Sequence, residues 1–157
     1  MEKRFKIPVS TLVVVYTPEL EVLLIERADR PGYWQSVTGS QDPGESLVQT
    51  AIREVREETG IDAARHALFD WNVSNLYEIY AIWRHRYEPG VTHNTEHVFG
   101  LRVPRRVDVT LAPEEHLRLR WAPWREAAGE VFSWSNREAI LMLPEKDAAL
   151  ARGATSP

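Results

Sequence analysis

Three glutamates, Glu54, Glu57 and Glu58, are crowded into the second half of the stretch GSQDPGESLVQTAIREVREETGI, residues 39–61. Like charges four residues apart on a helix repel each other, and the helix dipole disfavours anions near the carboxyl end. A hard divalent cation removes both costs, because Mg²⁺ takes oxygen ligands and is commonly held by one or two carboxylates together with substrate phosphates. The cluster therefore predicts an acidic helix face that holds a metal ion, which in turn holds a phosphate group.

The element that positions these carboxylates is a predicted helix from about Glu45 to Glu58, with Gly60 as its C-cap. At about 100° per residue, an apolar arc separate from the glutamates is expected to pack against a sheet; it consists of Val48, Ala51, Ile52 and Val55. The alternative to a metal site is a solvated helix face with an ion pair between Arg53 and Glu57, which contributes about 0.3 to 0.5 kcal/mol.

The loop and helix also match a known pattern at every fixed position. The form GX5EX7REUXEEXGU, in which U is aliphatic, is followed by Gly39, Glu45 and the run Arg53-Glu54-Val55-x-Glu57-Glu58-x-Gly60-Ile61. The chain therefore resembles the Nudix hydrolase family. The resemblance implies an α/β (α+β) fold, in which a mixed β-sheet is sandwiched between α-helices. It also implies hydrolysis of a nucleoside diphosphate linked to another group, with Mg²⁺, or Mn²⁺ as an alternative, as the cofactor.

The family resemblance assigns roles to the residues of this helix. Glu54 and Glu58 would be the principal metal ligands, and Glu57 would assist them. Arg53 would act with Glu45 to brace the loop against the helix, and we count Arg53 with the catalytic residues.

A second resemblance extends over most of the chain. The stretches concerned are YWQSVTGS (33–40), RHRYEPGVTHNTE (84–96), EEHLRLRW (114–121) and SWSNREAI (133–140). They are similar to one subgroup of the Nudix family, the bacterial dihydroneopterin triphosphate diphosphatases of folate biosynthesis. Many Nudix sequences have two glycines where this chain has Gly39-Ser40, and the subgroup shares the TGS form. The implied reaction is attack by water on a phosphorus of dihydroneopterin triphosphate, which gives dihydroneopterin monophosphate and pyrophosphate.

The subgroup resemblance also implies contacts outside the helix. Substrate contacts are expected from Lys6, Arg27, Thr38, Tyr77, Glu78, Ile79, Tyr80 and Ser133. Glu115 is added as a metal ligand beside Glu54 and Glu58, or as the base. The catalytic base is therefore sought among Glu57, Glu58 and Glu115, without a choice between them.

Each of these assignments has a structural alternative. Lys6 and Arg27 could be surface charges at strand ends, although a triphosphate needs such cations and arginine suits phosphate geometry. The tyrosines could be ordinary strand aromatics rather than a platform on which a pterin stacks. Thr38 could simply cap its loop, and the acidic pair that contains Glu115 could be solvated. Ser133 could begin a helix, but Ser135 has the better claim because Glu138 completes an S-x-x-E capping box.

The remaining elements follow from the apolar patterns and the turn residues. Strands are predicted at Pro8 to Tyr16, Glu21 to Arg27, Trp34 to Val37, Leu76 to His85, Glu96 to Val103 and Leu117 to Trp121. The first two should form a hairpin. A last helix is expected from Ser135 to about Met142, with Pro144 ending it.

Composition limits the classes of function. The 157 residues predict one domain, residues 1–150, followed by a frayed tail, residues 151–157. A net charge of −4 argues against broad nucleic-acid binding, and the absence of cysteine excludes disulfides and thiolate metal sites. No apolar run reaches the roughly 20 residues that a membrane helix needs. We therefore expect a cytoplasmic protein whose partner is a small-molecule pterin or nucleoside triphosphate, with no nucleic acid and no membrane; the oligomeric state is not predicted.

Rival functions stay open at this point. The Nudix pattern identifies a diphosphate and says little about the base, so a nucleoside triphosphate pyrophosphatase or a dinucleoside polyphosphate hydrolase is the main alternative. A ligand-binding sensor is disfavoured because such domains usually lack some of the glutamates, all of which are present here. A purely structural α/β domain is the last alternative. A comparison of substrates separates the enzymes, and release of pyrophosphate excludes the sensor.

Overall fold

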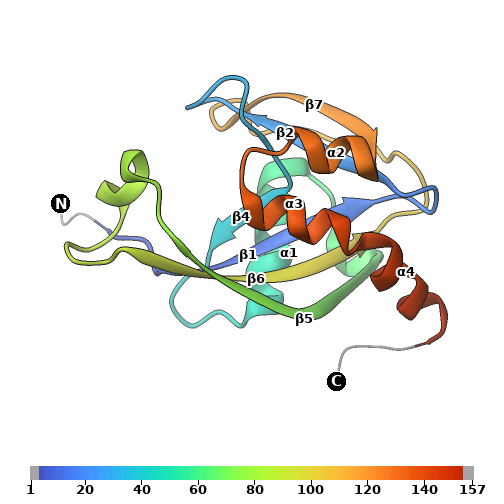
Figure 1. Ribbon diagram of the computed structural model, residues 1–157, viewed down its shortest axis with the longest axis horizontal. Helices are drawn as coiled ribbons and strands as arrows, with labels where there is room; N and C mark the ends of the chain where they lie inside the picture. Colours follow the sequence, from blue (N-terminus) through green and yellow to red (C-terminus); the bar gives the residue numbers. More distant parts are fainter. Residues whose placement is uncertain (1–3, 154–157) are drawn as a thin grey trace.

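The β-branched run that ends at Tyr16 forms the central strand, β1 (Val9–Tyr16), of a seven-stranded mixed sheet (Figure 1). The computed structural model describes residues 4–153. β1 pairs in parallel with β6 (His93–Arg102) and antiparallel with β4 (Val37–Ser40). Because β1 is buried along almost its whole length, its near-continuous apolar sequence is that of a strand covered on both faces.

The other strands extend the sheet to either side of β1. The hairpin with β2 (Glu21–Arg27) is present, although it pairs with β1 only at the turn, where Tyr16 lies opposite Val22. Beyond the turn β2 leaves β1 and pairs with β3 (Trp34–Gln35) and β7 (His116–Pro123). On the other side β5, residues 67–78, pairs antiparallel with β6.

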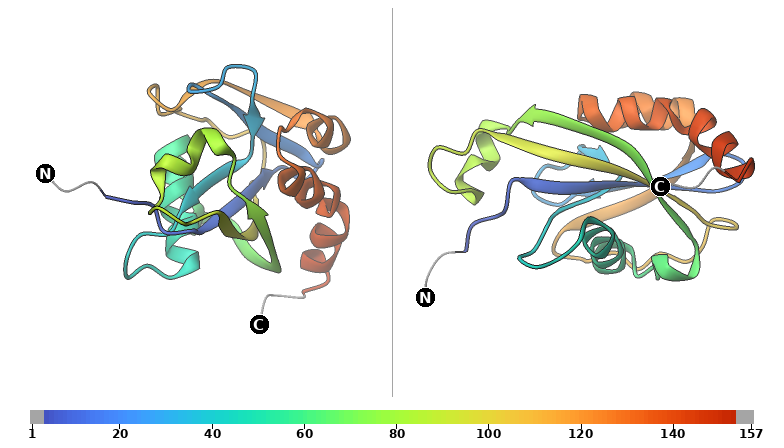
Figure 2. Two further views of the ribbon diagram at one scale, coloured as in Figure 1. Left: turned by 60° about the vertical axis from the view of Figure 1, so that its left-hand side comes forward. Right: turned by 90° about the horizontal axis from the view of Figure 1, so that it is seen from below.

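Helices cover both faces of the sheet, as Figure 2 shows in its right-hand view. One face carries α1 (Leu47–Thr59) and the short 3-10 helix η1 (Ala63–Arg65). The other carries α2 (Trp124–Glu130), α3 (Trp134–Leu141) and α4 (Leu143–Ala151). Alternate residues of β1 enter the two apolar cores, because side chains on a strand point to opposite faces. The predicted sheet between helices is confirmed.

Helix α1 differs in two respects from its prediction. It begins at Leu47 rather than Glu45, because Ser46 is its N-cap: the Ser46 hydroxyl accepts from the backbone N–H of Gln49, whose side chain accepts from Ser46 in return. The C-cap Gly60 is confirmed, with φ of 74°. Val48, expected on the packing arc, is 48% exposed, whereas Glu58 is 2% exposed. The acidic and packing faces are therefore not separate at the carboxyl end of the helix.

The strand predicted from Leu76 to His85 is confirmed only as far as Glu78. β5 begins at Ala67 and ends at Glu78, and the chain then forms a 3-10 helix, η2 (Ala81–Arg86). Figure 1 shows this helix in green at the outer end of the long β5–β6 hairpin. The N–H of Ile79 still donates to the carbonyl oxygen of Thr92, just before β6. The next backbone hydrogen bonds, such as that from Trp83 to Tyr80, are local. The apolar composition of this segment did not reveal the change, because its aromatic residues face one another rather than the sheet.

The predicted capping box at Ser135 is also wrong. The N-cap of α3 is Ser133, whose hydroxyl accepts from the N–H of Asn136 at 3.2 Å, while Ser135 is buried inside the helix. The predicted end of the helix near Met142 is confirmed, because α3 ends at Leu141 and Met142 is its C-cap, but a new helix, α4, begins at once and includes Pro144. This proline lies in the first turn of α4, where its missing N–H has no helical partner to lose.

The predicted frayed tail, residues 151–157, begins at the last residue of α4. Its residues 154–157 lie outside the part of the chain that the structure describes. Within residues 4–153, no helix combines the length and the apolar character needed to cross a membrane.

Candidate functional site

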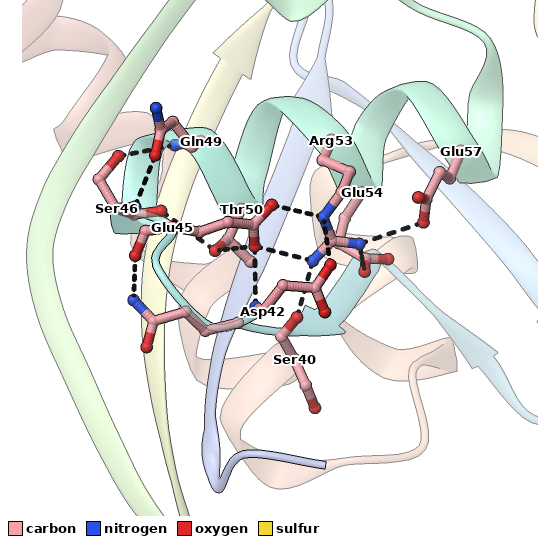
Figure 3. A network of polar contacts seen from close by, with 10 residues as sticks. Ser40, Asp42, Glu45, Ser46, Gln49, Thr50, Arg53, Glu54 and Glu57 are labelled. Atoms are coloured by element: carbon pink, nitrogen blue, oxygen red, sulfur yellow. Dashed lines mark hydrogen bonds and ion pairs between the residues drawn. The ribbon is translucent and has the colours of Figure 1, made fainter. Parts of the chain in front are cut away.

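Arg53 joins the glycine-containing loop to helix α1 (Figure 3). Its Nε and Nη2 atoms donate to the two oxygens of Glu45 at 2.6 and 3.0 Å, and Nη2 also donates to the carbonyl oxygen of Ser40 at 2.9 Å. The guanidinium group is the main cause that lowers the pKa of Glu45 to about 2. Glu45 is therefore ionised at neutral pH, and the expected contacts between Arg53 and Glu45 are present.

The remaining nitrogen of Arg53 reaches the acidic face of the helix. Nη1 donates to Glu54 at 2.6 Å and to the exposed Glu57 at 3.2 Å, so the predicted i, i+4 ion pair is present (Figure 3). Gly39 lies against Glu54 so closely that a Cβ at this position would be 2.0 Å from the Glu54 Cδ atom. The first glycine of the motif therefore makes room for a carboxylate.

Glu58 has the least ordinary environment of the cluster. Burial raises the pKa of Glu58 well above its usual range, and the neighbouring Glu54 raises it further. The backbone N–H of Thr38 donates to this carboxyl group, but Oε1 is buried without a hydrogen-bond partner. His116 Nε2 lies 3.4 Å from Oε1, yet burial, with Arg27, lowers the pKa of His116 to about 4. The imidazole is therefore neutral at pH 7 and does not balance the carboxylate.

These carboxylates open into one cavity of about 550 Å³, here called the carboxylate cavity. Its acidic side chains come from helix α1, from the segment before β7 and from two loops, and comprise Glu54, Glu57, Glu58, Glu114, Glu115, Asp29 and Asp42. Within residues 4–153, no three Asp, Glu or His side chains lie close enough together, as they stand, to hold a metal ion between them. An open set of oxygen donors with one buried, unpartnered oxygen nonetheless fits Mg²⁺, which keeps waters and substrate phosphates in its coordination shell.

A second cavity, of about 130 Å³, lies between η2, the start of α3 and the outer parts of β1, β5 and β6. We call it the aromatic cavity. Tyr80 and Trp83 stack with ring centroids 5.4 Å apart and planes 15° apart. Phe132 meets both rings edge-on, with centroids at 5.8 Å in each case. These three rings form an apolar wall against which a flat heterocycle can pack.

The two cavities share one wall. Residues that line both are Lys6, Arg27, Gln35, Thr38, Gly39, Ser40 and Arg86. Three of them are cations, so positive charge lies between the aromatic wall and the carboxylates. A ligand with a heterocycle at one end and several phosphates at the other would match this arrangement, in which an aromatic wall is followed by cations and then by carboxylates.

The shared cations are held in different ways. Arg27 donates to Asp29 at 2.7 Å and to Gln35 at 3.0 Å, and its guanidinium lies 4.3 Å from the centre of the Trp83 ring. Arg86 also reaches Asp29, at 3.0 Å. Partial burial and the nearby Arg86 lower the pKa of Lys6. A bound polyanion would relieve this repulsion among the cations.

Most of the residues proposed from the sequence line these two cavities. In the aromatic cavity are Tyr77, Ile79, Tyr80 and Ser133; in the carboxylate cavity are Glu54, Glu57, Glu58 and Glu115; Lys6, Arg27 and Thr38 line both. Arg53 supports the carboxylates from outside. The side chain of Glu78 is different: it is exposed, lines neither cavity and pairs with Arg84 at 3.0 Å.

Several cavity residues were not singled out from the sequence. They are Asp29, Trp83, Arg86, Asn94, Glu96, His116 and Phe132. The stretch RHRYEPGVTHNTE, which resembles the subgroup, contains Arg86, Asn94 and Glu96. The sequence therefore pointed to this segment, but not to these three residues within it. Trp83 and Phe132 carry no local signal, because only tertiary structure brings them together.

Comparisons with known proteins agree with this arrangement. A family model for the NUDIX domain matches residues 6–143. The dihydroneopterin triphosphate diphosphatase of Escherichia coli (strain K12) is 45% identical over 142 residues, covering 88% of this chain and 93% of that protein. The protein of the same name from Haemophilus influenzae is 40% identical over 134 residues, covering 83% and 84%. The solved structure of the E. coli dihydroneopterin triphosphate pyrophosphohydrolase matches with a TM-score of 0.83, covering 88% of this chain and 95% of that one.

Proposed function

The chain belongs to the Nudix hydrolase family, and from this premise we propose that it hydrolyses dihydroneopterin triphosphate to dihydroneopterin monophosphate and pyrophosphate. The observation that carries the proposal is the shared cationic wall between the aromatic and carboxylate cavities. The names of the two relatives and of the matching structure support the same substrate.

Nudix hydrolases generally use divalent metal ions, and we propose Mg²⁺ for this chain. Glu54, Glu58 and Glu115 would hold it, since they offer oxygen ligands in one cavity and Glu58 Oε1 has no other partner. When bound, the ion supplies neutralisation of the phosphate oxygens and polarisation of the phosphorus. The network around Arg53 keeps Glu54 and Glu57 directed toward the site.

The other residues of the chain bind and orient the triphosphate. Lys6, Arg27 and Arg86 lie where the phosphates would pass between the cavities, and arginine pairs well with phosphate oxygens. A carboxylate of the cavity accepts the proton of the attacking water. Glu57, Glu58 and Glu115 all line the cavity in which that water must lie.

The heterocycle would occupy the aromatic cavity, against the wall formed by Tyr80, Trp83 and Phe132. The carboxylate cavity alone does not distinguish a pterin triphosphate from a nucleoside triphosphate, because it contacts only the phosphate end. Selectivity for the pterin must therefore come from the aromatic cavity.

The proposed function is tested by product analysis with Mg²⁺ and dihydroneopterin triphosphate. The wild-type enzyme should release pyrophosphate and dihydroneopterin monophosphate, and chelation of the metal should stop the reaction. Glu58→Gln should lower kcat by about 100-fold or more, because it removes a metal ligand. Circular dichroism checks that the fold is kept, and Glu138→Gln, on the exposed side of α3, is the matched control. Near-normal turnover in Glu58→Gln would show that the metal assignment is wrong.

A further inference from the structure

Glu96 is a buried carboxyl group that the reaction described above does not use. It lies on β6, lines the aromatic cavity, and is 4% exposed. On the same face of this strand, the next residue, Val98, belongs to the apolar core under α2 to α4. Glu96 and Asn94 follow where that core ends. The apolar face of the sheet therefore becomes polar at the cavity.

The polar groups here are only partly satisfied. The hydroxyl of Ser135 donates to the Glu96 carboxyl group, but the Oε1 atom of Glu96 is buried with no hydrogen-bond partner. Asn94 donates through Nδ2 to Ser10 Oγ at 2.8 Å and to the Tyr77 hydroxyl at 3.0 Å. Its carbonyl oxygen, Oδ1, is likewise buried without a partner. Two hydrogen-bond acceptors are thus left over beside one cavity.

A purely structural role does not account for this arrangement. Glu96 forms no ion pair with any described residue, so no cation compensates its charge. Burying a carboxyl group with an unpaired oxygen costs more than burying an apolar side chain of similar size. The cost is recovered only when hydrogen-bond donors arrive from outside the chain, and the adjoining cavity is where a ligand would bring them.

We propose that Glu96, with Asn94 beside it, binds the edge of a heterocycle in which a ring N–H lies next to an exocyclic amino group. This is the 2-amino-4-oxo-pyrimidine edge that pterins and guanine share, and adenine lacks it. A carboxylate accepts two parallel N–H donors from such an edge. The inference rests on the proposed function and deepens it, because it names the group that selects the heterocycle.

The electrostatics of Glu96 agree with such a role. Burial raises the pKa of Glu96 to about 7. Without a ligand, the carboxyl group is therefore partly protonated at neutral pH. Two donors from a bound ligand would favour its ionised form. The apolar wall of Tyr80, Trp83 and Phe132 would hold the ring plane while Glu96 contacts its edge.

The test compares kcat/KM for dihydroneopterin triphosphate, dGTP and dATP in the wild type, Glu96→Gln and Glu138→Gln. Glutamine keeps the size of the side chain, but its amide presents one donor where the ligand also presents donors. We expect Glu96→Gln to lower kcat/KM about 10- to 100-fold for dihydroneopterin triphosphate and dGTP, and to leave dATP nearly unchanged. Glu138→Gln should leave all three values unchanged, because this exposed residue lines neither cavity.

A uniform fall for all three substrates, or no change for any, would overturn the assignment of Glu96. If Glu96→Gln does not fold, Glu96→Asp keeps the charge and withdraws it by one methylene. The same selective loss is expected in that variant, and an unselective one would contradict the proposal. Failure of the proposed function looks different: the wild type would then prefer dGTP or dATP to the pterin. A preference for dGTP that depends on Glu96 would still support recognition of the shared edge.

Discussion

At the scale of single residues, the site consists of carboxylates in unequal environments. Glu57 is exposed and paired with Arg53, whereas Glu58 is buried beside the apolar core. Glu54 lies between these extremes, with its carboxyl group pressed against Gly39. This gradient gives a metal ion both accessible and desolvated oxygens, and it depends on close approach between the loop and the helix.

Gly39→Ala tests that close approach. The new Cβ would overlap the Glu54 carboxyl group, which is the far end of a flexible side chain, so the carboxylate should move rather than the backbone. We expect kcat to fall about 100-fold, as for other misplaced catalytic groups, with little change in Tm. The control is Gly129→Ala in α2, where a Cβ meets nothing within 4 Å. A Gly39→Ala enzyme as active as the wild type would show that the position of Glu54 is unimportant.

Glu96 makes a prediction about stability and pH. Burial raises its pKa to about 7 in the folded protein from the ordinary 4.5 of a glutamate, so the folded state binds the proton more tightly than the unfolded state. The contribution of Glu96 to stability is therefore lost as pH rises from about 4.5 to 7, by on the order of 3 kcal/mol. The groups that face it do not titrate there: Ser10 and Ser135 are hydroxyls, and burial raises the pKa of Tyr77.

Urea unfolding of the wild type and Glu96→Gln at pH 5 and pH 8 measures this effect. The free energy of unfolding of the wild type should fall relative to that of the variant between these pH values. Parallel pH profiles for the two proteins would mean that the carboxyl group does not change its protonation state in this range.

At the scale of elements, α1 could be predicted closely because its signals are local. The charged positions, Gly60 and the apolar spacing all lie within one stretch. Its start was predicted at Glu45 because the capping box formed by Ser46 and Gln49 was not recognised among the many glutamates of this stretch. The exposure of Val48 was missed because angular position on the helix does not show that the first turn of α1 is less covered than the turns that hold Ala51 and Val55.

The cap of α1 provides a test that separates stability from catalysis. Ser46→Ala removes the hydroxyl that accepts from the N–H of Gln49 at 3.1 Å, and should lower the free energy of unfolding by about 1 kcal/mol. Because the glutamates of α1 proposed to hold the metal lie in the second half of the helix, kcat should change little. Urea unfolding and steady-state kinetics measure the two quantities, and Ser46→Asp, which can still cap, is the control. A large fall in kcat with unchanged stability would contradict this division of roles.

The other elements of the site could not be placed from local patterns. The segment Ala81–Arg86 has the apolar residues of a strand, but Tyr80 and Trp83 stack on each other in a 3-10 helix. In α3 two serines compete for the N-cap, and burial of Ser135 beside Glu96 decides in favour of Ser133. Both outcomes depend on residues distant in the chain, so no spacing rule reveals them.

At the scale of the whole molecule, long-range pairing joins the two cavities. The parallel register of β1 with β6 places Ser10 opposite Glu96. The long β5–β6 hairpin carries η2 outward (Figure 2). The N–H of Lys6 bonds to the carbonyl oxygen of Arg86 at 2.9 Å, which links the segment before β1 to the end of η2. The motif of α1 predicts from sequence alone where the phosphate end of the ligand binds. The heterocycle end requires the tertiary structure, because the walls of the aromatic cavity come from segments that lie far apart in the chain.

The central claim is that this joined cavity selects a pterin triphosphate. The most direct measurement is kcat/KM of the wild-type enzyme, with Mg²⁺, for dihydroneopterin triphosphate, dATP and a dinucleoside polyphosphate. We predict that the value for dihydroneopterin triphosphate exceeds both others by about 10-fold or more, because one well-placed pair of hydrogen bonds is worth about 1 to 3 kcal/mol. A value for either nucleotide that equals or exceeds that for the pterin would contradict the claim.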